Sequence, residues 1–167
     1  MDAEQLSLVE WRAWLRGHSR QFLLFARQQT RCEADAEDVL QEALVEAWNR
    51  TPDHAPPPLP LVYATIRRRA IDLARSNDRR TRRELHDDPA RPALFEDETE
   101  MTGMRDLLES GLNGLGDEQR EVVILKVWGG LTFDEVGTAL DISPNTAASR
   151  YRYGIEALRR TRKPLLV

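Results

Sequence analysis

The sequence predicts an all-α protein with two small helical domains, at residues 5–80 and 104–163, joined by a flexible acidic linker at residues 81–103. Three observations lead to this fold class. Apolar side chains recur every three or four residues over long segments, which is the spacing of one buried helix face. No segment shows the strict alternation of a β-strand. In the C-terminal domain, two short helical patterns separated by a tight turn predict a helix-turn-helix.

The first fifty residues are predicted to form helices with one acidic face. Ser7 and Glu10 have the spacing of a capping box, so helix is expected from there, with or without a break, to about Gln29. Another helix is expected to open near Asp35, and its apolar side chains, from Val39 onward, would be buried. The side chains left facing outward are Asp38, Gln41, Glu42 and Glu46.

A proline-rich loop and a basic helix are predicted next. Residues 49–60 carry prolines that remove backbone donors and restrict the chain, so an extended loop is expected. Helix should resume at Leu61 and continue to about Arg75, and the arginine-rich end of residues 76–103 could extend it. The stretch from Arg67 to Arg83 holds eight arginines against two aspartates, a density that favours contact with nucleic-acid phosphates over a merely solvated face.

The linker is expected from composition. Residues 76–103 lack apolar periodicity, and the part from Glu84 to Glu100 carries seven acidic side chains against Arg91 alone. Two interpretations stay open for this acidic run. It could fold back over the neighbouring basic surfaces, or it could serve only as a soluble spacer.

The C-terminal domain ends in the predicted helix-turn-helix. Helical patterns at residues 104–112 and 117–127 precede it, and its first helix opens with the capping box of Thr132 and Glu135. Asp141 stands in the turn, and Ser143 with Pro144 starts the second helix. That helix offers polar and cationic side chains for a DNA major groove: Thr146, Ser149, Arg150 and Arg152. A pair of ordinary core helices with solvated arginines is the alternative.

Composition excludes several classes of function. The single cysteine cannot form an internal disulfide, and the three histidines are too scattered for a metal site, so no metal or other cofactor is expected. The sequence shows no grouping of a nucleophile, a base and an orienting residue, and it shows no phosphate-binding loop. No enzyme is therefore predicted. No apolar run approaches the ~20 residues of a membrane span. The N-terminus lacks the basic start of a signal peptide, and a cytoplasmic protein without membrane insertion is expected.

Two segments carry a family resemblance. Residues 34–50, ADAEDVLQEALVEAWNR, and residues 116–160 resemble, in order, parts of the two domains of bacterial sigma factors of the extracytoplasmic function (ECF) group of the sigma-70 family. The resemblance implies a non-catalytic, dissociable initiation factor that binds core RNA polymerase, through the β′ clamp helices and the β flap, and directs it to promoter DNA. A sigma-like regulator or anti-sigma-binding adaptor that does not start transcription is the alternative.

The resemblance also implies roles for particular residues. Asp38, Gln41 and Glu42 would face the β′ clamp helices. The helix with Tyr63, Arg67, Arg68 and Arg75 would lie beside the melted minus ten element. Because Tyr63 stands at the end of this basic helix nearest the loop, we also expect its ring to stack on a base. Thr146, Ser149, Arg150 and Arg152 would meet the minus thirty-five element. An anti-sigma factor is a further partner that the family allows.

Overall fold

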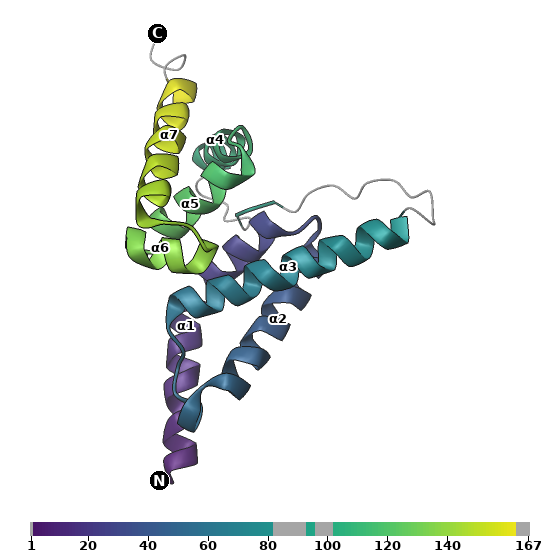
Figure 1. Cartoon of the computed structure of the whole chain (residues 1–167), viewed down its shortest axis with the longest axis vertical. Helices are drawn as coiled ribbons and strands as arrows, with labels where there is room; N and C mark the ends of the chain where they lie inside the picture. Colours follow the sequence, from purple (N-terminus) through teal and green to yellow (C-terminus); the bar gives the residue numbers. More distant parts are fainter. Residues whose placement is uncertain (1, 82–92, 96–101, 163–167) are drawn as a thin grey trace. The chain divides into compact units, whose positions relative to one another are not determined.

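The computed structural model describes residues 2–81, 93–95 and 102–162, and all regular secondary structure in these ranges is helical (Figure 1). The predicted fold class is therefore confirmed. The chain divides into two compact units, residues 1–92 and 93–167. Within the described ranges, none of the helices is both long enough and apolar enough to cross a membrane.

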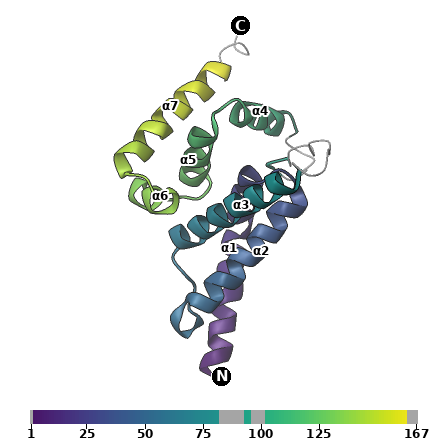
Figure 2. The ribbon, with the colours of Figure 1, turned by 45° about the vertical axis from the view of Figure 1, so that its right-hand side comes forward.

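The N-terminal unit consists of three long helices and one short turn. Helices α1 (Ala3–Gln29), α2 (Glu33–Arg50) and α3 (Leu59–Thr81) pack against one another, and a 3-10 turn, η1 (Pro52–His54), follows α2. Figure 2 shows α3 lying across α2, with which it is in contact. The apolar faces of α1, α2 and α3 form one core, whose fully buried side chains include Phe22, Phe25, Val62, Tyr63 and Ile66.

Helix α1 begins earlier than the sequence predicted. It starts at Ala3 and runs without a break past Gly17 to Gln29. Its cap is Asp2, whose backbone N–H donates to the side-chain oxygen of Gln5 over 3.3 Å. The predicted start at Ser7 is wrong because this earlier pair already caps the helix.

Helix α3 begins two residues before the predicted Leu61 and extends past Arg75 into the arginine-rich stretch, as the sequence allowed. It begins at Leu59 and carries Pro60 in its first turn, where a missing backbone N–H breaks no helical hydrogen bond. The carbonyl of Pro58 accepts from the N–H of Leu61 over 3.1 Å. At its other end α3 continues to Thr81, so much of the arginine-rich stretch is helical.

The C-terminal unit consists of α4 (Thr102–Asn113), α5 (Asp117–Val127), α6 (Phe133–Leu140) and α7 (Pro144–Arg162). Its core includes the buried side chains of Leu112, Leu125, Leu131, Val136 and Ala147. Arg120 is also buried, and its guanidinium donates to the carbonyls of Leu112 and Leu115, both over 2.8 Å. This arginine therefore ties the end of α4 to the turn that follows it.

Two residues of the predicted linker, Leu94 and Phe95, pack against α4 and Trp128 of the C-terminal unit. Leu94 is 4% exposed, and the backbone N–H groups of Leu94 and Phe95 both donate to the carboxylate of Glu109 on α4. The ring of Phe95 lies 5.5 Å from that of Trp128, centroid to centroid. The linker prediction is wrong for these residues, because they are hydrogen-bonded to Glu109 and packed against Trp128. The rest of the acidic run lies outside the described residues.

This anchor leads to a stability prediction. Leu94→Ala is expected to destabilise the C-terminal unit by about 2 to 5 kcal/mol, the usual cost of truncating a buried leucine. Urea unfolding followed by the fluorescence of Trp128, in a background where the other three tryptophans are phenylalanine, would measure it. Leu108→Ala is the matched control, since Leu108 is 38% exposed and should cost far less. Equal losses in the two variants would contradict the anchor.

Candidate functional surfaces

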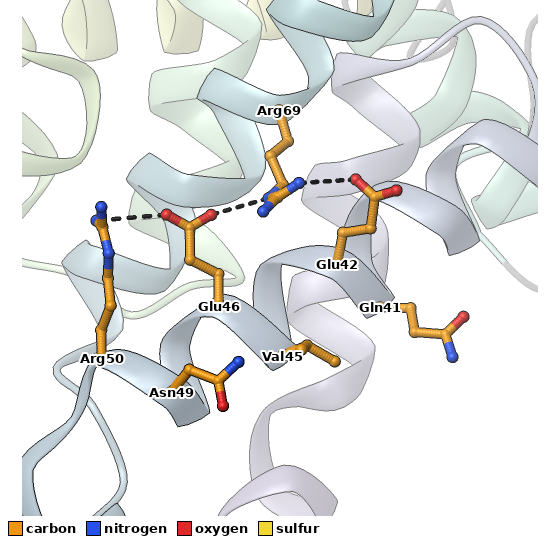
Figure 3. Close-up of a pocket in the computed structure, with 7 residues that line it drawn as sticks. All are labelled: Gln41, Glu42, Val45, Glu46, Asn49, Arg50 and Arg69. Atoms are coloured by element: carbon orange, nitrogen blue, oxygen red, sulfur yellow. Dashed lines mark hydrogen bonds and ion pairs between the residues drawn. The ribbon is translucent and has the colours of Figure 1, made fainter.

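The acidic face of α2 is exposed and forms one side of a groove. Asp38, Gln41 and Glu42 are all exposed, as the sequence predicted. Val45 lies on the same face and is 55% exposed. The groove is lined by Gln41, Glu42, Val45, Glu46, Asn49, Arg50 and Arg69 (Figure 3). Sequence analysis missed Val45, although its four-residue spacing from Gln41 was a usable signal.

Glu46 does not face outward with the other acidic residues. Its carboxylate accepts from Arg69 Nε over 2.9 Å, pairs with Arg50 over 3.3 Å and also pairs with Arg68. Its side chain is only 14% exposed. Burial alone would raise the pKa of Glu46, but the hydrogen bonds from Arg68 and Arg69 outweigh it and lower the pKa below its ordinary value. The prediction of a solvated Glu46 is wrong because α3 supplies these arginines.

Arg69 connects Glu46 to the exposed acidic face of α2. Its guanidinium bridges Glu46 and Glu42, with 2.9 Å to a carboxylate oxygen of each (Figure 3). Glu42 is thus partly neutralised, although its side chain remains 61% exposed. Arg68, which the sequence predicted to contact DNA, has half of its side chain exposed but is paired with Glu46.

The basic side chains of α3 continue beyond this network. Arg67 is half-buried, whereas Arg75, Arg79 and Arg80 are exposed. Arg68, Arg75 and Arg79 follow at intervals of seven and four residues, so they share one stripe of the helix. Such a stripe can follow a phosphate backbone.

Tyr63 lies in the core of the N-terminal unit and not on its surface. It is 1% exposed, and its ring packs edge-on against Phe22 at 5.2 Å and Phe25 at 5.3 Å between centroids. Burial raises the pKa of the Tyr63 hydroxyl well above its ordinary value. The structure contradicts the predicted stacking on a DNA base, because the faces of the ring are covered by protein.

The turn between α6 and α7 is built by local signals. Thr132 Oγ1 accepts from the N–H of Glu135 over 3.2 Å, and the Glu135 carboxylate accepts from the N–H of Thr132 over 3.0 Å. Asp141 has φ 55° and ψ 50°, the left-handed conformation that aspartate tolerates better than most residues. At Gly137 a Cβ would lie 2.7 Å from the carbonyl oxygen of Ile142, so the turn needs glycine there.

The predicted DNA-contacting residues of α7 have different environments. Ser143 Oγ accepts from the N–H of Thr146 over 3.1 Å and lies 2.9 Å from the Thr146 hydroxyl. Ser149 is half-buried. Arg150 is 26% exposed and lies 3.5 Å from the carboxylate of Glu118 on α5.

The exposed arginine of this set lies beside an aromatic ring. Arg152 is exposed, and its guanidinium lies 5.1 Å from the centre of the ring of Tyr153, itself 53% exposed. The four predicted residues thus share one helix but not one face. Asn145, which sequence analysis did not single out, is exposed at the start of α7.

Comparisons with known proteins agree on one family. Residues 14–80 match the model of sigma-70 region 2, and residues 60–163 match the model described as ECF sigma factor. The chain is 30% identical over 154 residues to an RNA polymerase sigma-E factor of Streptomyces avermitilis, covering 91% of this chain and 84% of that protein. It is 31% identical over 132 residues to the ECF RNA polymerase sigma factor SigK of Mycobacterium ulcerans, covering 74% and 70%.

A solved structure has the same fold. The sigma factor RpoE of Bartonella quintana, crystallised with the anti-sigma factor NepR, superposes with a TM-score of 0.71 at 18% identity, covering 92% of this chain and 96% of that one. The ECF model spans more than half of the chain, and the sequence relatives cover most of it. The protein therefore belongs to the ECF sigma factors of the sigma-70 family.

Proposed function

We propose that the protein is a dissociable initiation factor that binds core RNA polymerase and directs it to specific promoters. Membership of the ECF sigma factors supports this function. The observation that carries it is that each unit presents one surface suited to such work. In the N-terminal unit this is the exposed acidic face of α2, and in the C-terminal unit it is the exposed face of α7. The proposed role of both surfaces is binding, without a catalytic step.

The polymerase-binding surface is Asp38, Gln41 and Glu42 with Val45 among them. An exposed apolar side chain surrounded by polar and charged ones has the composition of a protein interface, with a dry centre and a polar rim. The acidic charge suits a basic coiled coil and would steer association, and the resemblance supports the β′ clamp helices as that partner. The β flap is the corresponding proposed partner of the C-terminal unit.

Promoter DNA is the proposed ligand of α3 and α7. Arg67, Arg68 and Arg75 would contact the minus ten region, with Arg68 oriented through its pair with Glu46. The proposed contacts with the minus thirty-five element come from α7, at Thr146, Ser149, Arg150 and Arg152. An anti-sigma partner is proposed as well, on the support of a solved relative that was crystallised with one.

Run-off transcription tests this function directly. Core polymerase reconstituted with the protein should produce discrete transcripts from a library of genomic fragments, and core polymerase alone should not. The alternative, a sigma-like regulator or adaptor, predicts no such transcripts and no retention of core polymerase by the immobilised protein.

The exposed stripe of α3 leads to a prediction about salt. Arg75→Ala is expected to weaken promoter binding by the holoenzyme and to lower the slope of log affinity against log salt by about 1, because one phosphate contact is lost. Titrations at several potassium concentrations would measure the slope. Arg12→Ala, at an exposed arginine of α1, is the control. Equal slopes for wild type and Arg75→Ala would rule out a phosphate contact.

A further inference from the structure

The geometry of α7 identifies which of its side chains face away from the C-terminal unit. Ala147 has no exposed surface, a Cβ at Gly154 would lie 2.8 Å from Val123, and Leu158 reaches the backbone of Gly111 on α4. These positions, seven and four residues apart, mark the buried side. Because each residue turns an α-helix by about 100°, the opposite side is marked by another line of residues. That line is Asn145, Ser149, Arg152 and Glu156.

Asn145 is the first member of this outward line, and its side chain is available for binding. It is exposed, and its amide makes no hydrogen bond with any side chain or backbone group in residues 2–81, 93–95 and 102–162. Its neighbours are engaged. The hydroxyl of Thr146 is hydrogen-bonded to Ser143, and the guanidinium of Arg150 lies 3.5 Å from the carboxylate of Glu118. Asn145 therefore keeps both a free donor and a free acceptor, a pair that arginine cannot offer because its guanidinium has no acceptor.

We propose that Asn145 reads an adenine in the upstream promoter element, and this inference rests on the function proposed above. In helix-turn-helix proteins, the N-terminal residues of the second helix contact base edges in the major groove. There adenine presents the N7 acceptor next to the N6 amino donor, which matches the paired NH₂ and oxygen of an asparagine amide. Guanine presents two acceptors, and the amide oxygen has no donor to meet there.

The test uses the holoenzyme and duplex DNA. The preferred upstream element is first selected from a randomised library with wild-type protein, and each base pair is then replaced in turn. Replacing one particular adenine should lower wild-type affinity about tenfold, near the low end for a bidentate contact. Asn145→Ala should bind the selected element about tenfold more weakly. It should bind all four bases at that position equally and keep the wild-type preferences elsewhere.

A substitution in the DNA makes the test specific to one atom. Replacing that adenine by 7-deazaadenine removes only the N7 acceptor, and should weaken binding of wild type severalfold while leaving Asn145→Ala unchanged. Asn145→Asp removes the donor, keeps the size and should lose the same preference with normal helicity, which separates recognition from folding. Asn113→Ala, at an exposed asparagine ending α4, is the control and should behave as wild type.

Two results would overturn the inference. One is a wild-type pattern of base preferences in Asn145→Ala, and the other is an equal loss on every sequence, which would indicate a phosphate contact. A wild-type holoenzyme without any upstream preference would instead contradict the proposed function itself.

Discussion

Reversing the charges of Asp38 and Glu42 together, as Asp38→Arg with Glu42→Arg, is expected to lower the affinity for core RNA polymerase by at least about a hundredfold. The reversal replaces attraction by like-charge repulsion at the proposed interface, where such juxtapositions cost several kcal/mol. Folding should be little affected, because both side chains are exposed and surface changes usually cost within ~0.5 kcal/mol. Co-purification with core polymerase and a fluorescence titration would measure the loss.

Two further variants separate this effect from other causes. Glu42→Arg also places a cation beside Arg69 and could act through that contact. The single change Asp38→Arg breaks no ion pair within the described residues, and it should still weaken binding about tenfold. Glu4→Arg with Glu10→Arg makes the same change of net charge at exposed positions of α1 and should bind normally. If the α1 variant lost as much affinity as the α2 variant, the interface would be misplaced and total charge would be the cause.

Tyr63→Ala is expected to destabilise the N-terminal unit by about 3 to 5 kcal/mol, the range for truncating a buried aromatic residue. The buried ring packs against Phe22 and Phe25, so its removal leaves a cavity in this core. Thermal unfolding should show a fall of more than about 10 °C in the transition of this unit. A small shift together with a specific defect in promoter melting would restore the DNA-stacking role.

Tyr63→Phe separates the ring from its hydroxyl. Near neutral pH this variant should stay folded and support promoter melting as wild type does. The two proteins should differ in alkali. Because burial raises the pKa of Tyr63, the unfolded state loses its phenol proton above about pH 10 while the folded state keeps it, so wild-type stability falls as pH rises. Tyr63→Phe should lose less stability between about pH 10 and 11, measured by urea unfolding.

Features that depend on neighbouring residues in the sequence were predictable. The capping box of Thr132 and Glu135 and the left-handed turn at Asp141 need only a few adjacent residues, and the structure contains both. The exposure of Asp38, Gln41 and Glu42 followed from the apolar spacing of their own helix. In each case a local hydrogen bond or helical periodicity decides the outcome.

Features that depend on packing between helices were not predictable. Glu46 has the sequence context of an outward-facing residue, and only the approach of α3 brings Arg68 and Arg69 to it. Tyr63 precedes a basic stretch, which suggested nucleic acid, but Phe22 and Phe25 of α1 bury it. Arg150 lies on the expected helix, and its direction toward Glu118 depends on where α5 runs.

The ion pairs of Glu46 have a consequence for exchanging parts between related proteins. Arg50 comes from α2, while Arg68 and Arg69 come from α3, so one half-buried carboxylate depends on both helices. A hybrid joined in residues 51–58 would combine a carboxylate from one parent with arginines evolved for another, and an unmatched buried charge is costly. A hybrid joined between the two compact units keeps the set intact. Modular recombination in this protein should therefore tolerate junctions between the units and disfavour junctions between α2 and α3.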